Sequence, residues 1–415
     1  MRPIVACLFL VNPLVVACDG DVSAVQSSSD AQSLHGAGCP KRDKNDAGGV
    51  AGGSALWLKS FDDRVEITGV ASDAWGNVLL ARSGTQTSKL NPNGDLLWSK
   101  PFGQLVATDR IGNIYVAGKL EGTLDLGSEL LSSNGGTDVY VVELSPRGEV
   151  LHGTTLGGTS DEDVLSLAVD SLGNLVVSGS GLGTVKIDHE DNIVWAKNFY
   201  GHVALDSADN VVLTGTLMGA IDFGGGPLTS SGGGDVFVAK LGPNGDHVFS
   251  RRFGDAADLQ QGQALAVDHS DNVIIAGVFE GALDFGAGAL KFPRCPEEVW
   301  CKTAGFVTQF DSRGRLLWSL SFEPMRELQG VAVDSLNHVV FSGALPGGVP
   351  PYRIPVVSEL DPHGSALWRR AEWPESGIGA GHRVAIDPCD NVVWSLSALP
   401  AIGSNEQPYV SKLSP

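Results

Sequence analysis

Short apolar runs rich in β-branched residues alternate with turn residues from residue 55 to the end of the chain. Seven times, an apolar run ends on an aspartate, and a Gly-Asn or Asp-Asn pair and a second apolar run follow, although the sixth copy reads Asn337-His338 in place of the pair. Gly-Asn and Asp-Asn pairs tolerate the positive φ of tight turns, so each copy predicts a β-hairpin. The seven aspartates are Asp73, Asp109, Asp170, Asp206, Asp268, Asp334 and Asp387.

A second hairpin is predicted after each first one. In the first copy, residues 89–98 place a Pro-x-Gly turn between two apolar segments, the second ending on Leu-Trp. Similar segments occur at residues 143–151, 186–195, 240–249, 309–318 and 359–368. Four strands per copy, repeated along the chain, are typical of β-propeller blades.

The two ends of the repeat region complement each other. The seventh copy stops at Pro415 without its Leu-Trp strand, whereas residues 55–61 match residues 96–102 and precede the first copy. We therefore expect an all-β fold, a seven-bladed β-propeller over residues 55–415, whose last blade is closed by the N-terminal strand. Such closure removes an open sheet edge.

The best copies carry a family resemblance. Residues 135–140, 156–158 and 168–176, read as Gly-Gly-Thr-Asp-Val-Tyr, Leu-Gly-Gly and Ala-Val-Asp-Ser-Leu-Gly-Asn-Leu-Val, resemble the bacterial SBBP-type β-propeller repeat. The resemblance covers residues 55–415 at varying quality. It implies a propeller fold and an extracytoplasmic setting, and it implies no activity, because this repeat group has no shared catalytic motif.

The first residues predict the compartment. An apolar run, residues 4–16, is too short to span a bilayer and leads into Val-Val-Ala-Cys, which resembles a lipobox ending at Cys18. We expect residues 1–17 to be a lipoprotein signal peptide and residues 18–54, rich in Gly and Ser, to be a flexible tether. The protein would then be anchored by lipid, extracytoplasmically, to the outer membrane or another periplasmic face of the cell envelope.

Charge and cysteine content agree with this setting. The formal net charge of -20 disfavours nucleic acid as a partner. Outside the leader and Cys18, four cysteines remain, which allow three pairings in an oxidising compartment. We favour Cys295 with Cys301 and Cys39 with Cys389, and free thiols are the alternative.

Catalytic and metal motifs are absent from the sequence, which contains no Gly-x-Ser-x-Gly, no His-Glu-x-x-His and no phosphate-binding loop. We expect no catalytic residue, no metal and no cofactor. Calcium is an alternative at the acidic turns 91–95 and 188–192, but side chains there more simply cap their own hairpins. Five tryptophans at one phase of the repeat, Trp57, Trp98, Trp195, Trp318 and Trp368, are expected to pack between blades.

Long second-to-third-strand loops predict a binding face. These insertions, residues 119–137, 216–234, 278–304 and 344–353, share one face of a propeller with the blade-joining loops, and variable loops on a rigid scaffold often carry recognition. The contact candidates are Trp300, Asp161, Glu162, Asp163, Asp255, Asp258, Arg326 and Glu327, with Trp75 and Trp373 as further exposed tryptophans.

The sequence thus favours a non-enzymatic binding or scaffold module that recognises a protein or glycan. Two alternatives stay open: a hydrolase or lyase with paired acids at the central channel, and a purely structural envelope protein.

Overall fold

The structure is a computed structural model, and it describes nine stretches of the chain. They are residues 52–61, 65–84, 86–256, 259–291, 303–325, 327–346, 353–372, 379–398 and 407–415. Their regular elements are β-strands. Across these stretches there is no helix with the length and apolar character needed to cross a membrane.

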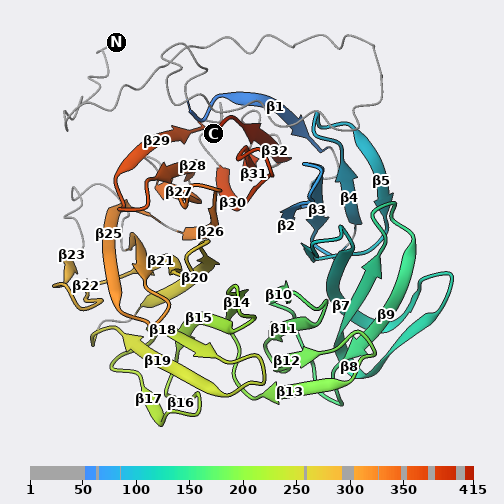
Figure 1. Cartoon of the computed structure of the whole chain (residues 1–415), viewed down its shortest axis with the longest axis horizontal. Helices are drawn as coiled ribbons and strands as arrows, with labels where there is room; N and C mark the ends of the chain where they lie inside the picture. The colour runs from blue at the N-terminus through green and yellow to red at the C-terminus, as the bar shows by residue number, and fades with distance from the viewer. Residues whose placement is uncertain are drawn as a thin grey trace, which may run out of the picture. The chain divides into compact units, whose positions relative to one another are not determined.

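Within the described residues the strands form seven four-stranded antiparallel sheets and two short two-stranded ones. The seven larger sheets surround a common centre, as Figure 1 shows. The fold is therefore the seven-bladed all-β propeller that the repeat predicts. We number the blades 1 to 7 from β2 onward.

The blades follow one another in chain order. Blade 1 holds β2 (Ile67–Ser72), β3 (Val78–Arg82), β4 (Gln86–Leu90) and β5 (Leu96–Lys100). Blade 2 holds β6 (Leu105–Thr108), β7 (Ile114–Asp125), β8 (Leu130–Leu144) and β9 (Val150–Leu156). Blade 3 holds β10 (Ser166–Val169), β11 (Leu175–Gly179), β12 (Gly183–Ile187) and β13 (Ile193–Lys197). Blade 4 holds β14 (His202–Leu205), β15 (Val211–Leu217), β18 (Asp235–Leu241) and β19 (His247–Phe253).

The remaining three blades complete the ring. Blade 5 holds β20 (Gln260–Val267), β21 (Val273–Phe279), β24 (Ala304–Phe310) and β25 (Leu316–Pro324). Blade 6 holds β26 (Glu327–Val333), β27 (Val339–Pro346), β28 (Arg353–Leu360) and β29 (Ala366–Ala371). Blade 7 holds β30 (Gly379–Ile386), β31 (Val392–Ala398), β32 (Gln407–Leu413) and β1 (Ala55–Ser60).

The N-terminal strand closes the ring, as predicted. β1 pairs antiparallel with β32, with Trp57 opposite Lys412 and Lys59 opposite Val410. The pairing continues beyond the strands, because the Ser414 amide donates to the Ser54 carbonyl at 2.8 Å. The strand therefore covers the edge of β32, which would otherwise offer unpaired backbone groups to another chain.

The hydrophobic core lies between neighbouring blades. Residues of β3, β11 and β21 are buried on both faces of their strands, because a neighbouring sheet packs on each side. One cluster, for example, joins Val212 and Phe253 of blade 4 to Ile275 and Phe306 of blade 5. This packing explains why the second and third strands read as continuous apolar runs rather than alternating ones.

Aspartates cap the hairpins between first and second strands. Asp73 Oδ1 accepts the amides of Trp75 and Asn77, both at 2.9 Å, and its Oδ2 accepts the Asn77 side-chain amide. The acidic turns considered for calcium do the same, since Asp188 Oδ1 accepts the amides of Glu190 and Asn192. These contacts support the capping interpretation of both sets of turns.

Tryptophans of the outer strands connect one blade to the next, which confirms the packing prediction. The Trp57 indole donates to the Pro92 carbonyl at 2.9 Å, and the Trp195 indole donates to the Pro243 carbonyl at 2.9 Å. Each acceptor belongs to the Pro-x-Gly turn of the following blade. The ring of the tryptophan lies against the glycine of that turn, where a side chain would collide with it.

The described ribbons of the insertions in blades 4 and 5 lie at the outer edge of the ring. Short ribbons formed by β16 (Ala220–Asp222) with β17 (Pro227–Thr229) and by β22 (Ala282–Leu283) with β23 (Leu290–Lys291) extend outside blades 4 and 5 (Figure 1). Each ribbon buries an aromatic residue, Phe223 or Phe285, in its blade's core. The insertions therefore contribute to the core as well as to the surface.

Candidate functional site

Two faces of the propeller carry different loops. The joining-loop face holds the blade-joining segments and the second-to-third-strand insertions, and it includes the sequence-predicted acids. The hairpin face holds the seven aspartate hairpins.

On the joining-loop face the candidate acids bind neighbouring loops. Asp161 Oδ1 accepts the Thr137 amide at 2.9 Å, and Glu162 Oε2 accepts the Gly158 amide at 3.2 Å. Asp163 pairs with Lys119 at 2.8 Å.

The same holds in two other blades. Asp255 accepts the Gln260 side-chain amide at 2.9 Å and the Ala282 amide at 3.1 Å. Glu327 pairs with Arg353 at 3.0 Å. These acids fasten joining segments to insertions, so they are already engaged within the chain.

Several predicted residues lie outside the described stretches. They are Cys18, Cys39, Cys295, Cys301, Trp300, Trp373, Asp258 and Arg326. Cys389 is described, in the hairpin between β30 and β31, where its amide donates to Asp387 Oδ1. The lipid anchor and the disulfide pairings stay predictions.

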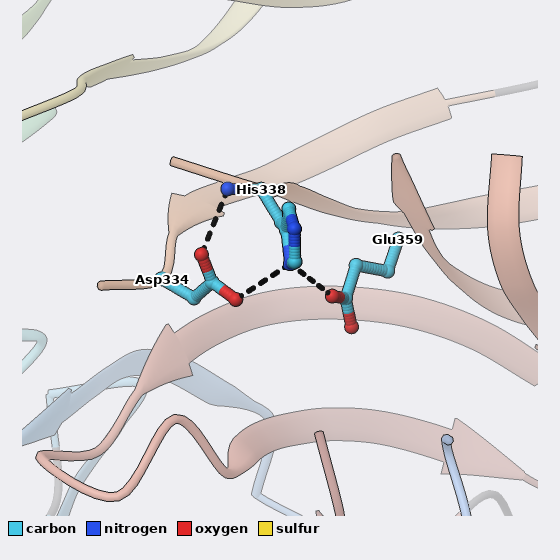
Figure 2. Close-up of side chains that lie close together, drawn as sticks. All are labelled: Asp334, His338 and Glu359. Carbon is cyan, nitrogen blue, oxygen red and sulfur yellow. Dashed lines mark hydrogen bonds and ion pairs between the residues drawn. The ribbon is translucent and has the colours of Figure 1, made fainter. Parts of the chain in front are cut away.

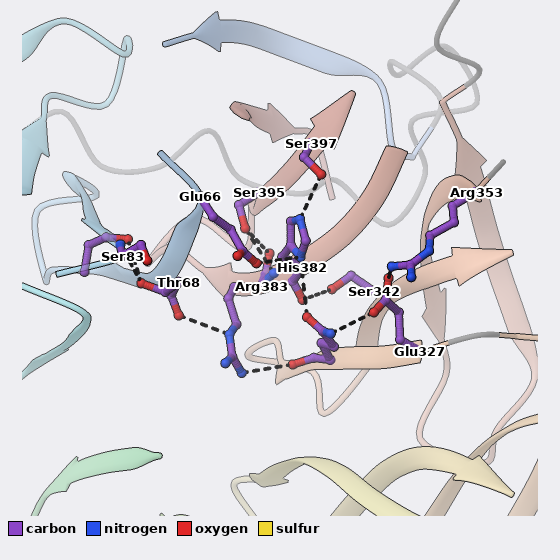
Figure 3. Close-up of polar contacts among 12 residues, drawn as sticks. Glu66, Thr68, Ser83, Glu327, Ser342, Arg353, His382, Arg383, Ser395 and Ser397 are labelled. Atoms are coloured by element: carbon purple, nitrogen blue, oxygen red, sulfur yellow. Dashed lines mark hydrogen bonds and ion pairs between the residues drawn. The ribbon is translucent and has the colours of Figure 1, made fainter. Parts of the chain in front are cut away.

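An arginine connects three blades in the central channel. Arg383 of β30 donates through Nε to the Thr68 carbonyl of blade 1 at 3.1 Å and through Nη1 to the Gln329 carbonyl of blade 6 at 3.2 Å (Figure 3). Burial lowers the pKa of its guanidinium, and the nearby Glu66 opposes that shift. Arginine nevertheless keeps its charge at physiological pH.

Two histidines accompany this arginine. Burial and the charge of Arg383 lower the pKa of His202, in blade 4, to about 3, so its imidazole is neutral at physiological pH. His382 contacts Ser397 Oγ through Nε2 at 3.0 Å, and its Nδ1 lies 3.4 Å from Glu66 Oε1 (Figure 3).

This network offers little for acid–base hydrolysis. A glycosidase-like site needs two carboxylates that converge on the substrate, about 5 to 9.5 Å apart. In the cluster of Figure 3 the acids are Glu66, beside His382, and Glu327, which Arg353 already binds. The contacts of the cluster join blades 1, 6 and 7, so the geometry favours a structural role for it.

Buried ion pairs support the hairpin face in four blades. A lysine on the third strand reaches the capping aspartate at 2.6–2.8 Å, and the side chains of every pair are at most 5% exposed. The pairs are Asp73–Lys89, Asp170–Lys186, Asp206–Lys240 and Asp387–Lys412. The recurring lysine is visible in the sequence, although our sequence reasoning did not use it.

These pairs shift the pKa of the aspartates and also connect blades. Burial alone would raise the pKa of Asp170 and Asp206, but hydrogen bonds from the lysine and the hairpin asparagine hold both below the usual value. Lys89 Nζ also donates to the Pro146 carbonyl of the next blade at 2.8 Å. Each lysine thus stabilises its own hairpin and the neighbouring blade.

Blade 6 departs from this pattern. Glu359 stands where those four blades have the lysine, a position taken by Glu143 in blade 2 and Gln309 in blade 5, and His338 replaces the hairpin asparagine. His338 Nδ1 lies 2.9 Å from Asp334 Oδ2 and 2.9 Å from Glu359 Oε1, as Figure 2 shows. These three side chains offer one nitrogen and two oxygen ligands to a metal ion.

Apolar side chains project from the hairpin tips of three consecutive blades. Trp75 of blade 1 is 58% exposed, Ile111 of blade 2 is 74% exposed and Leu172 of blade 3 is 78% exposed. We call these three residues the apolar tips. The sequence indicated Trp75 as a contact residue, whereas Ile111 and Leu172 were missed because a single apolar turn residue carries no signal before the fold is known.

No family model matches the chain, and no curated protein matches its sequence. Among solved structures, it is similar to the RRP9 WD40 repeats, with 11% identity and a TM-score of 0.53 over 87% of this chain and 99% of that chain. The structure of U3-55K is similar too, with 10% identity and a TM-score of 0.54 over 87% and 100% of the two chains.

A third similar structure, that of a streptogramin B lyase, has 11% identity and a TM-score of 0.46 over 86% of this chain and 98% of that chain. At such identities the likeness to the WD40 propellers shows the fold alone. The protein is therefore a seven-bladed β-propeller, and its function has to be argued from its own surface.

Proposed function

We propose that this protein is a lipid-anchored, extracytoplasmic binding module without catalytic activity, which holds a partner protein at the cell envelope. The lipobox-like Val-Val-Ala-Cys18 segment and the resemblance to SBBP-type repeats support the setting. The propeller supports the scaffold role, because propellers present fixed surfaces around a rigid ring.

The apolar tips carry the proposal. Trp75, Ile111 and Leu172 lie at equivalent positions of neighbouring blades and expose more than half of their surface. Adjacent exposed apolar side chains on one face are typical of protein contact sites, and tryptophan is enriched among residues that dominate binding energy. Aliphatic tips suit a protein partner better than a glycan.

The joining-loop face is the surface that the sequence predicted as the binding face. Its described acids bind loops of the same chain, and its insertions lie partly along the outer strands. We therefore place the contact surface on the hairpin face and treat the joining-loop face as the competing site.

A photocrosslinking experiment in the native envelope tests this choice. A photoreactive residue replaces Ile111 on the hairpin face or, as the matched control, Met218 on the joining-loop face, which is 72% exposed. We expect a discrete protein adduct from residue 111 alone, and we expect Leu172→Asp to abolish it without changing the melting temperature.

The other outcomes contradict the proposal in different ways. An adduct from residue 218 alone would move the contact to the joining-loop face. An adduct from neither position would contradict a protein partner and leave a glycan ligand or a structural role. A Cys18→Ser variant that stays in the membrane fraction would contradict the lipid anchor.

A further inference from the structure

A buried carboxylate oxygen in blade 2 lacks a partner. Asp138 of β8 is fully buried, and its Oδ1 accepts no hydrogen bond from the described residues, whereas its Oδ2 accepts the Asn134 amide at 2.6 Å. A buried acceptor left unsatisfied costs about 1–3 kcal/mol, and more when the group is charged. Its environment therefore needs an explanation.

A second carboxylate faces the same space. Glu162, on the segment that joins blades 2 and 3, is 6% exposed. A Cβ placed on Gly157 would lie 2.5 Å from Asp138 Oδ1 and 2.5 Å from Glu162 Oε2, so these oxygens are at most twice that distance apart. The glycine leaves a small space that both oxygens border.

Blade 4 has the same site with a cation beside it, and Asp235 Oδ1 and Gln260 Oε1 there also accept no hydrogen bond from the described residues, so the difference between the blades lies in their charge. Asp235 is the blade 4 equivalent of Asp138. Each aspartate lies on the third strand opposite a leucine at the same position of the second strand, Leu217 in blade 4 and Leu120 in blade 2. Arg252 Nη1 contacts Asp235 Oδ2 at 2.5 Å.

The other two positions differ between the blades. Gln260 takes the place of Glu162. The main-chain amide of Gln260 donates to the Gly234 carbonyl, as the main-chain amide of Glu162 donates to the Thr137 carbonyl. Thr155 of blade 2 is the equivalent of Arg252 of blade 4. Thr155 pairs with Tyr140, and Arg252 pairs with Phe237, which is the same position of the third strand.

The two blades therefore differ in charge. At the three matched positions blade 4 has one carboxylate, one guanidinium and a neutral amide, with Asp255 bound to that amide at 2.9 Å, while blade 2 has two carboxylates and a hydroxyl. Lys119 is on the same face, but it pairs with Asp163 at 2.8 Å, and both of those side chains are 45% exposed. Two adjacent buried carboxylates without a compensating cation are strongly unfavourable.

We propose that Asp138 and Glu162 bind a calcium ion, which supplies in blade 2 the positive charge that Arg252 supplies in blade 4. The donor set consists of oxygens alone, which suits a hard cation and disfavours zinc. Calcium takes six to eight oxygens in flexible geometry, so main-chain carbonyls of the joining segment and water complete the shell. The ion would fasten the segment between blades 2 and 3.

Calcium titration of the purified full-length chain tests this proposal. We expect isothermal titration calorimetry in a metal-free buffer to show one site, and millimolar CaCl2 to raise the melting temperature relative to EDTA. Asp138→Asn and Glu162→Gln should each weaken calcium binding at least tenfold. Asp163→Asn, on the same segment, is the matched control and should bind calcium as the wild type does.

A further variant keeps the test decisive if single substitutions disturb folding. Thr155→Arg combined with Glu162→Gln rebuilds the blade 4 set in blade 2, and we expect it to fold stably in EDTA and to lose the calcium-dependent shift. Identical melting temperatures of the wild type in calcium and EDTA, without binding heat, would overturn the proposal. An equal effect of MgCl2 would overturn the assignment to calcium.

Discussion

The aspartate hairpins of blades 1–3 and those of blades 4–7 differ at a single turn position. Three residues after the capping aspartate, the backbone has a φ between 59° and 90° in every blade. Blades 1–3 place Gly76, Gly112 and Gly173 there, whereas blades 4–7 place Asp209, Asp271, Asn337 and Asp390 there. Glycine adopts this conformation freely, and aspartate or asparagine adopts it at some cost.

The side chains of blades 4–7 compensate for that cost. Asp209 accepts the Ser171 amide at 2.9 Å and the Ser171 hydroxyl at 2.5 Å, from the preceding blade. Asp271 and Asp390 bind the equivalent serines, Ser207 and Ser335. Asn337 accepts the His269 amide. We call these contacts latches between blades.

In two of blades 1–3 the absence of the latch has a local reason. In the latched blades the donor is the residue after the capping aspartate of the preceding blade. For position 76 that residue is Pro388, which has no amide hydrogen. At position 112 a side chain would collide with the ring of Trp75. The same three blades carry the apolar tips. Leu336, at the equivalent tip of the latched blade 6 hairpin, is also 49% exposed, so apolar residues occur at hairpin tips in both groups but lie on consecutive blades only in blades 1–3.

The buried ion pairs occur in both groups of hairpins, and breaking one should have the largest effect on stability. Lys89→Met in blade 1 and Lys240→Met in blade 4 each leave a buried aspartate without its cation. We expect each to lower the free energy of unfolding by about 3–5 kcal/mol. Chemical denaturation of both variants measures this, and a loss below 1 kcal/mol in either would contradict the assigned role of the pairs.

Aspartate at the glycine positions should be tolerated unequally. In Gly112→Asp the new Cβ meets the Trp75 ring, so we expect a loss of about 2–3 kcal/mol. In Gly173→Asp the nearest atom is 3.9 Å away, so backbone strain alone acts, and the loss should be about 1 kcal/mol. Equal melting temperatures for the two variants would contradict this explanation.

Removing a latch should cost less than either ion pair. Asp209→Gly loses two hydrogen bonds to Ser171, each worth about 0.5–1.5 kcal/mol, but it relieves backbone strain. We expect a net loss of about 1 kcal/mol and faster hydrogen exchange at the boundary of blades 3 and 4. Unchanged exchange at that boundary would show that the latch is unimportant.

The last comparison concerns acid and His202, which belongs to blade 4 of the latched group. The pKa of His202 is about 3 in the folded state and 6.5 in the reference state, so the unfolded chain binds a proton first as pH falls. Stability contributed by neutral His202 is therefore present above about pH 6.5 and lost progressively toward pH 3.

His202→Gln should flatten this loss, which melting temperatures at pH 7.5 and 5.0 measure. The paired aspartates act at lower pH, because their pKa values are depressed below 3.8 in the folded state. If the melting temperature of the variant falls between pH 7.5 and pH 5.0 as much as that of the wild type, the loss of stability does not come from His202.

The sequence predicted the blades, their number and the closing strand because each rests on local patterns repeated along the chain. The apolar phase, the Asp-to-Asn turn and the terminal half-blade all leave such patterns. The packing of Trp195 against the next turn followed from its phase in the same way.

Contacts between blades were harder to foresee, because they join residues far apart in the chain. Asp138 and Glu162 come from a strand and a joining segment, and only the register shows that Thr155 replaces an arginine. Sequence reasoning likewise placed the candidate acids on an open surface, since nothing local reveals that Asp163 reaches Lys119.

The most direct test of the binding-module account is a photocrosslinking scan of equivalent hairpin tips in intact cells. The scan compares Ile111 and Leu172 with Ala208 and Ser270, which are also exposed. The account predicts one protein adduct from residues 111 and 172 and none from residues 208 and 270. Equal adducts from both groups, or none from either, would contradict it.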